Sequence, residues 1–294
     1  MNIETKPRKI FNVINIIFLT LLAIVTFYPF WYVLVASLNE GRDFVSGGVY
    51  FWPRVFTLEN YSMAFEDKRI FHSLGISIAR TLIGTSLSIV LTSLLAYAIS
   101  VKTLPGRSFF ALFFYFSTIF SGGMIPYYML LRDLGLTDSF WLYIIPSLYS
   151  FFNFLILRTS FDNIPTEMRE SAYIDGAGDL TILLKIYLPL AVPTIATISL
   201  FIGVGHWNDW FVGSYYQSDS DLIPASTLLR ILLSEVSGAT ANVGQESSTT
   251  ALRSYTPQSI QMAFVMILTM PIVVVYPFLQ KYYVKGVMIG SVKG

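Results

Sequence analysis

The chain has 294 residues, of which 54% are hydrophobic and only 13% are charged, and its mean hydropathy is +0.61. A soluble domain carries about 25% charged residues, so this composition excludes a soluble surface of that size and favours lipid as the solvent. The net charge of +1 gives no reason to expect a nucleic-acid partner, and the absence of cysteine excludes disulfides, thiolate metal sites and a cysteine nucleophile.

The first predicted element follows the N-terminal stretch MNIETKPRK. Residues 10–39 carry no charge. The apolar part of a secretory signal is only about 7–15 residues long, so we expect residues 10–37 to form an uncleaved membrane-spanning helix.

Five further apolar segments approach the length of about 20 residues that a spanning helix needs. The sequence therefore predicts an all-α integral membrane protein with six transmembrane helices in a single domain, residues 1–294. The predicted spans are residues 10–37, 71–101, 108–131, 139–158, 187–209 and 256–280.

The distribution of Lys and Arg between the connecting segments predicts the orientation. Eleven of these residues fall on the side of the two termini and seven on the other, mostly in long loops where the rule is weak. We therefore expect both termini, and the loop 161–188, to be cytoplasmic. The opposite side holds segments 40–70 and 209–253, and the Ser/Gly-rich end of the latter, residues 234–250, reads as a flexible loop.

The second predicted span contains Arg80. An arginine at the centre of a span costs about 2.5–3.5 kcal/mol on insertion scales. Two interpretations stay open: the side chain lies near the outer interface and reaches water, or it faces a translocation pathway or a partner subunit.

Later spans carry other small or polar candidates to line a pathway, namely Gly122, Gly123, Tyr149, Asn153 and Asn208. The segment SGGMIP also predicts a bend in the third span. The alternative role for the two glycines is close helix packing. Trp207 and Trp210 are interpreted as interfacial anchors, with sugar stacking as the alternative.

Residues 161–193 form a charged, glycine-broken element between the fourth and fifth spans. Pro165 suits the first turn of a helix. TEMRESAYID reads as two to three helical turns that end at Gly176, because glycine accepts the left-handed cap conformation. Asp179 is the candidate N-cap of a second short helix, and Pro189 and Pro193 bend the chain into the fifth span.

Met168, Ala172 and Gly176 share one face of the predicted helix. Amphipathic helices that rest on lipid headgroups favour Lys and Arg together with bulky apolar residues, whereas this helix carries three acids, one Arg and small residues. The pattern therefore favours docking of a protein partner over contact with headgroups.

The segment resembles the EAA loop of ABC-importer permeases. The matching residues are Glu170-Ser171-Ala172, Asp175-Gly176-Ala177 and the later Ile186-x-Leu188-Pro189, and Ser171 departs mildly from the alanine of the consensus. In that family the loop forms a coupling helix that docks on the ATPase subunit. The resemblance implies that Glu170, Ala172, Asp175, Gly176 and Ala177 are the docking residues here.

The resemblance covers nearly the whole chain and is closest to the carbohydrate-uptake branch, through FTLENYSMAF, SGGMIPYYMLLRDLGLTDSFW, HWNDWF and FLQKYYVKGVMIGSVKG. It implies a type I importer permease fold, alternating access and residence in a bacterial cytoplasmic membrane. The implied partners are a second permease in a heterodimer, two ATPase copies, an extracytoplasmic substrate-binding protein and an oligosaccharide, including uronate-containing ones.

The chain contains no motif for its own energy source or chemistry. It has no G-x-x-x-x-G-K, so ATP and Mg²⁺ are expected on partner ATPases, and it has no H-E-x-x-H or other paired metal-ligand spacing. We therefore predict no catalytic residue, metal or cofactor in this chain. A membrane scaffold or receptor that recruits a cytosolic protein, and an intramembrane enzyme, are the alternatives.

Overall fold

The computed structural model describes residues 6–241 and 256–291, and these residues are almost entirely helical. Within those ranges the only β pairing is an isolated bridge between Asn39 and Phe56. The all-α prediction is confirmed. The chain forms two compact units, unit 1 (Met1–Lys68 and Ile231–Thr269) and unit 2 (Arg69–Arg230 and Met270–Gly294). A division into two compact units does not test whether the chain is one domain, so the single domain stays a prediction.

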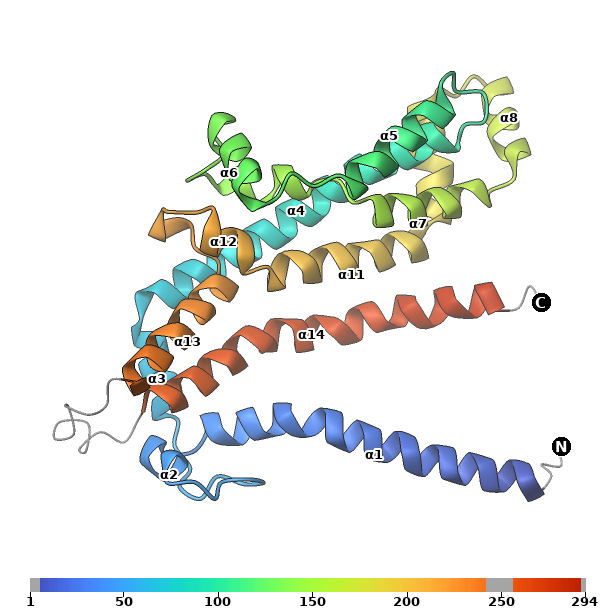
Figure 1. Ribbon diagram of the computed structural model, residues 1–294. Helices are drawn as coiled ribbons and strands as arrows, with labels where there is room; N and C mark the ends of the chain where they lie inside the picture. The colour runs from blue at the N-terminus through green and yellow to red at the C-terminus, as the bar shows by residue number, and fades with distance from the viewer. Residues whose placement is uncertain (1–5, 242–255, 292–294) are drawn as a thin grey trace. The chain divides into compact units, whose positions relative to one another are not determined.

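In the described ranges, three helices are long and apolar enough to cross a membrane by themselves: α1 (Lys6–Ser37), α4 (Lys68–Ser100) and α14 (Pro257–Ser291). At about 1.5 Å per residue, each exceeds the roughly 30 Å of hydrocarbon. They coincide with the predicted first, second and sixth spans (Figure 1). The apolar side chains of α1 between Ile10 and Phe30 are exposed, as expected of a helix that faces lipid.

The other three predicted spans are bent pairs of shorter helices. The pairs are α5 (Arg107–Ile119) with α6 (Met124–Asp133), η1 (Phe140–Tyr143) and η2 (Ile145–Ser147) with α7 (Phe151–Asp162), and α9 (Asp179–Ile182), η3 (Leu183–Tyr187) and α10 (Leu188–Leu190) with α11 (Val192–Asn208). Their bends are 116°, 49° and 84°. Six spans result only if each pair crosses the membrane as one.

The bend in the third span lies at the predicted segment SGGMIP. The backbone is extended at Phe120, and Gly123 has φ of 89° in the region that favours glycine. Pro126 falls in the first turn of α6, where its missing N–H leaves no helical bond unmade. The break therefore precedes the proline.

The bend before the fifth span also follows from proline chemistry. Pro189 has no N–H to donate and its ring crowds the carbonyl one turn earlier, and the π-helical turn η3 lies just before it. Pro193 then occupies the first turn of α11. The predicted bend at these two prolines is confirmed.

Unit 1 is organised around buried polar side chains. The Asn60 amide donates to the backbone oxygens of Ser37 and Asn39 at 2.9 and 2.8 Å, and the Ser259 hydroxyl donates to the Asn60 side-chain oxygen at 2.7 Å. These bonds tie the end of α1 to α3 (Glu59–Glu66) and to the start of α14.

Unit 2 holds the main apolar core, where α4, α7, η3 and α11 meet. Its largest members are Tyr97, Phe154, Phe161 and Tyr187. Helix α8 (Thr166–Ile174) lies next to this core, at the ends of α4, α5 and α7 that are far from α6 and α12 (Phe211–Tyr215), as Figure 1 shows.

One loop prediction fails in part. Residues 234–241 are helical, because α13 (Ala225–Ala241) continues into the segment predicted to be a flexible loop. The remainder of that prediction, residues 242–250, lies outside the described residues. The remaining short helices are α2 (Gly41–Val45) and η4 (Ser220–Leu222).

Candidate functional site

The first candidate site is the α8 loop, residues 163–182. Pro165 precedes α8 as its N-cap rather than lying in the first turn, and Glu167 is the first-turn acid. Gly176 has φ of 81°; its N–H bonds the Tyr173 carbonyl at 3.0 Å, and the Ala177 N–H bonds the Ala172 carbonyl at 2.9 Å. This pair of bonds is a Schellman motif, so the predicted glycine stop is confirmed.

The predicted docking residues divide into two groups by burial. Glu170, Asp175 and Gly176 are exposed, whereas Ala172 and Ala177 are half-buried against the main core of unit 2. The predicted face of Met168, Ala172 and Gly176 is therefore only partly exposed to solvent. The sequence reasoning missed Ile174, which is 87% exposed at the end of α8.

Asp179 has a different role from the one predicted. Gly178 precedes α9 as its N-cap and no side chain caps this helix, so the predicted cap at Asp179 is wrong. The Asp179 carboxylate instead accepts hydrogen bonds from the hydroxyls of Tyr97 and Tyr173 and lies 3.6 Å from the Arg169 guanidinium. Arg169, Tyr173, Tyr97 and Asp179 together are called the Asp179 cluster below.

The second candidate site surrounds Arg80. This side chain is 1% exposed, its guanidinium lies 2.8 Å from the Asp209 carboxylate, and it also donates to the Asp209 backbone oxygen at 3.1 Å. Its guanidinium carbon is 4.7 Å from the centre of the Tyr143 ring. The expectation that the Arg80 side chain reaches water is therefore wrong, whereas its position near the outer interface stays a prediction.

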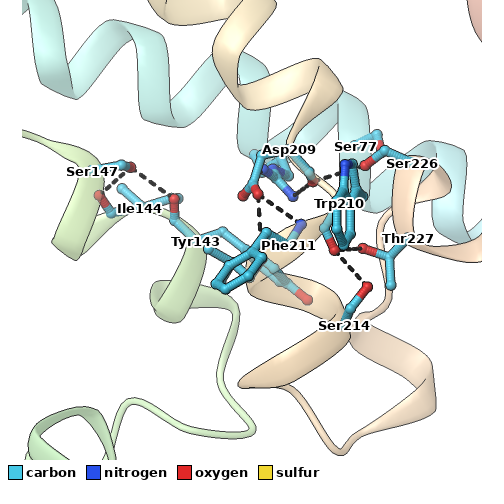
Figure 2. Close-up of polar contacts among 12 residues, drawn as sticks. Ser77, Tyr143, Ile144, Ser147, Asp209, Trp210, Phe211, Ser214, Ser226 and Thr227 are labelled. Atoms are coloured by element: carbon cyan, nitrogen blue, oxygen red, sulfur yellow. Dashed lines mark hydrogen bonds and ion pairs between the residues drawn. The ribbon is translucent and has the colours of Figure 1, made fainter. Parts of the chain in front are cut away.

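Asp209 is held in place at the junction of α11 and α12. One carboxylate oxygen accepts the backbone N–H groups of Phe211 and Val212 at 3.0 and 3.3 Å, which leaves the other for Arg80. The Ser226 hydroxyl donates to the Asp209 carbonyl at 2.8 Å (Figure 2). These bonds hold the Asp209 carboxylate at the start of α12 with its second oxygen directed toward Arg80.

The neighbouring Trp210 carbonyl connects α12 to α13. It accepts hydrogen bonds from the hydroxyls of Ser214 and Thr227, at 2.7 and 3.1 Å (Figure 2). The guanidinium carbon of Arg230 lies 4.4 Å from the centre of the Trp210 ring, so the guanidinium covers one face of that ring.

A cavity of about 310 Å³, called the Arg80 cavity below, opens beside this ion pair. Its polar lining includes Arg80, Asp209, His206 and Asn153, and its aromatic lining includes Tyr127, Tyr143 and Tyr216. Asn153 is only 7% exposed, and its side-chain oxygen has no hydrogen-bond partner among the described residues. A pocket of this size, with aromatic walls and a few polar groups, is typical of small-molecule sites.

The imidazole of His206 packs directly against Gly84 of α4. A Cβ built on Gly84 would lie 2.4 Å from the His206 Nε2. Only glycine at position 84 therefore lets α4 approach the imidazole this closely. Sequence reasoning missed both residues, although a glycine in an apolar span is a signal of close approach.

The remaining predicted pathway residues lie elsewhere. Gly122 and Gly123 are exposed at the break between α5 and α6, and a Cβ on Gly123 would meet nothing within 4 Å, so within this chain close packing does not explain it. The Tyr149 hydroxyl donates to the Phe114 carbonyl at 3.2 Å, and Asn208 is exposed at the end of α11. Only Arg80 and Asn153 of the six line the cavity.

Comparison with known proteins decides the family. The chain matches, over residues 1–289, the family described as "Binding-protein-dependent transport system inner membrane component". The chain belongs to this family. It is therefore a multi-pass membrane permease subunit of a transport system and not an enzyme, which removes the scaffold and intramembrane-enzyme alternatives.

Similar individual proteins cover the full chain as well. A polygalacturonan/rhamnogalacturonan transport system permease protein of Bacillus subtilis (strain 168) is 39% identical over 287 residues, which is 98% of this chain and 99% of that protein. A solved bacterial ABC transporter involved in the import of the acidic polysaccharide alginate has a chain with 29% identity and a TM-score of 0.85, and the match covers 96% of this chain and 100% of that chain.

A second solved structure has the same fold at lower identity. It is a bacterial alginate ABC transporter in complex with an alginate pentasaccharide-bound periplasmic protein, with 15% identity and a TM-score of 0.61 over 92% of this chain and 93% of that chain. Together with the 29% identical structure, this likeness confirms the predicted fold of an ABC importer permease.

Proposed function

We propose that this chain is a permease subunit of an ATP-driven importer for oligosaccharides derived from polysaccharides, including chains with uronate units. The observation that carries the proposal is the family match over residues 1–289 together with the EAA element on α8, in which Glu170 is exposed. The substrate class is supported by the polygalacturonan/rhamnogalacturonan permease and the alginate importer, because both of those proteins handle acidic polysaccharides.

The remaining subunits follow from what the chain lacks. Its sequence has no phosphate-binding loop, so ATP and Mg²⁺ bind to a partner ATPase, present in two copies as the family resemblance implies. The described part of the chain has up to six spans, which are few for a complete pathway, so a second, different permease contributes the other wall. The family description names a binding protein, and the substrate-binding protein delivers the oligosaccharide from outside.

Both termini and the α8 loop face the cytoplasm in this proposal, as the Lys and Arg distribution predicts. Glu170, Asp175 and Gly176 are the exposed docking residues for the ATPase. Ala172 and Ala177 contribute by their small size, because their packing against the main core holds α8 close to the spans.

The Arg80 cavity forms part of the pathway wall. Asn153 presents an amide, Arg80 a neutralised cation, and the tyrosines present rings that suit the apolar face of a sugar. Gly122, Gly123, Tyr149 and Asn208 lie outside this cavity, and a role for them in the pathway would require surfaces completed by the second permease.

The test is uptake by the reconstituted complex. Proteoliposomes that contain both permeases and the ATPase, with the binding protein outside and ATP inside, should accumulate labelled oligogalacturonide. Vesicles with a non-hydrolysable ATP analogue should not. Equal accumulation with and without ATP hydrolysis would overturn the ATP-driven mechanism. Uptake of neutral oligosaccharides alone would overturn the uronate assignment.

A further inference from the structure

One carboxylate in the α8 loop joins two elements that are far apart in the sequence. The Tyr97 hydroxyl, from α4, donates to Asp179 Oδ1 at 2.7 Å, and the Tyr173 hydroxyl, from α8, donates to the same oxygen. The Arg169 guanidinium lies 3.6 Å from that oxygen, stacks over the Tyr173 ring at 4.9 Å and donates to its hydroxyl at 3.0 Å. Asp179 therefore connects α8 to α4.

The α4 end of this connection is rigid. Tyr97 is buried and meets the Tyr187 ring edge-on at 5.0 Å between ring centres, and Tyr187 meets Phe161 in the same way at 5.3 Å. These rings belong to the main core of unit 2. A force applied at Asp179 therefore acts on packed helices rather than on a free side chain.

The covalent connection between α8 and α9, in contrast, is soft. It consists of Asp175, Gly176, Ala177 and Gly178, and a Cβ added to either glycine would meet no atom of the described residues within 4 Å. Glycines rotate freely about their backbone bonds. Ala172 and Ala177 also pack against the main core, but the Asp179 cluster supplies the hydrogen bonds that join α8 to α4 directly, so its loss should let part of the movement of α8 be absorbed at these glycines.

The bent fifth span, which begins with α9, contacts α4 at both of its own ends. Asp179 begins α9 and Asp209 follows the end of α11, and these carboxylates bind Tyr97 and Arg80 of α4. At about 1.5 Å per residue, the two points on α4 lie about 25 Å apart along the helix. Both ends of the bent fifth span are thus joined to α4.

We propose that Asp179 is the positioning residue that transmits movement of α8 to α4 and, through the joined fifth span, to the Arg80 cavity. The inference rests on the proposed function, because α8 moves only if an ATPase docks on it. Two discrete positions of this joined body would be the alternating states of the pathway.

The first experiment measures sugar transported per ATP hydrolysed in the full reconstituted complex. Asp179→Ala should lower this ratio at least about fivefold, the lower end of typical coupling between sites, while ATPase co-purification stays normal. Tyr97→Phe and Tyr173→Phe each remove one hydroxyl and should lower the ratio less. Adding Tyr97→Phe to Asp179→Ala should change nothing further, because the bond is already lost.

Two control variants match these changes. Thr181→Val alters an exposed hydroxyl two residues from Asp179, and Tyr115→Phe removes a hydroxyl that makes no hydrogen bond in the described part of the chain. Both should keep the wild-type ratio. A purely structural Asp179 would lower protein yield and thermal stability at an unchanged ratio, and that result would overturn the proposal.

The second experiment measures the joined movement itself. Because the chain has no cysteine, Glu167→Cys in α8 and Leu94→Cys in α4 can carry spin labels in a complex with cysteine-free partners. The distance between labels should stay constant between nucleotide-free and ATP-bound complexes, and Asp179→Ala should broaden it. A wild-type distance that changes between the two states would overturn the joined movement.

These results separate the two proposals. A wild-type complex without ATP-dependent uptake would contradict the proposed function. An active wild-type complex in which Asp179→Ala keeps both the transport ratio and a narrow label distance would contradict only the role of Asp179.

Discussion

Two carboxylates bind α4, and their surroundings differ. Asp209 pairs with a cation that is 1% exposed, whereas the side chain of Asp179 is 61% exposed and binds two hydroxyls and an arginine whose side chain is 19% exposed. A buried charge that loses its partner is costly, whereas an exposed ion pair contributes about 0–1 kcal/mol. The Arg80–Asp209 pair should therefore matter more for the free energy of folding than the Asp179 cluster, whose proposed role is to join parts that move together.

The largest expected effect tests the buried side of this comparison. Asp209→Asn keeps an oxygen that can cap α12 but leaves Arg80 as a buried unpaired charge, so we expect a loss of about 3–5 kcal/mol of folding free energy. The measurement is thermal unfolding of the purified protein in detergent. The double variant Arg80→Met with Asp209→Asn should recover most of the loss, and an unchanged melting temperature in Asp209→Asn would contradict the account.

The next effect concerns the exposed surface of α8. Glu170→Lys reverses an exposed charge, so folding should be unaffected, but loss of a docking partner should weaken ATPase association by about 2–5 kcal/mol. Co-purification of the ATPase and uptake measure the change. Glu167→Lys, one turn earlier on the same helix, should affect both less. Normal association in Glu170→Lys would remove Glu170 from the docking surface.

A third change tests how tightly α4 packs beside the cavity. Gly84→Ala places a methyl group against His206 and should destabilise the fold by about 1–3 kcal/mol. Gly75→Ala lies in the same helix with nothing within 4 Å, so it should stabilise slightly because alanine favours the helix. Equal melting temperatures for the two variants would contradict the close approach.

The smallest effect belongs to a half-buried carboxylate in unit 1, that of Asp43. Hydrogen bonds from Asn39 and Arg54 lower the pKa of Asp43 below its usual value. The stabilisation is therefore complete above the ordinary aspartate pKa of about 4 and is lost as pH falls through the lower folded value. Arg54→Ala should reduce the extra acid sensitivity below about pH 4, measured by melting at several pH values. An identical pH dependence in both proteins would contradict the assigned cause.

Much of the fold was predictable because membranes impose simple rules on a sequence. Long charge-free runs predicted α1, α4 and α14, and the prolines predicted the bend before α11. The αL conformation of Gly176 was predictable for the same reason, since it depends only on neighbouring backbone atoms.

The candidate sites were less predictable. Arg80 and Asn153 were recognised as candidates, but the partner of Arg80 was not, because Asp209 is 129 residues away. Asp179 was read as a helix cap because local rules favour aspartate there, whereas tertiary packing brought Tyr97 to its carboxylate from 82 residues away.

The sequence by itself showed that lipid surrounds this protein, where its longest helices lie and which helical element marks its family. Each of these features depends on composition or on residues that are close along the chain. Only the tertiary structure decided which charges meet: it enclosed Arg80 with Asp209, turned Ala172 toward the core and joined α8 to α4 through Asp179. The physical reason is that burial and hydrogen bonding depend on distance in space, which local sequence patterns do not specify.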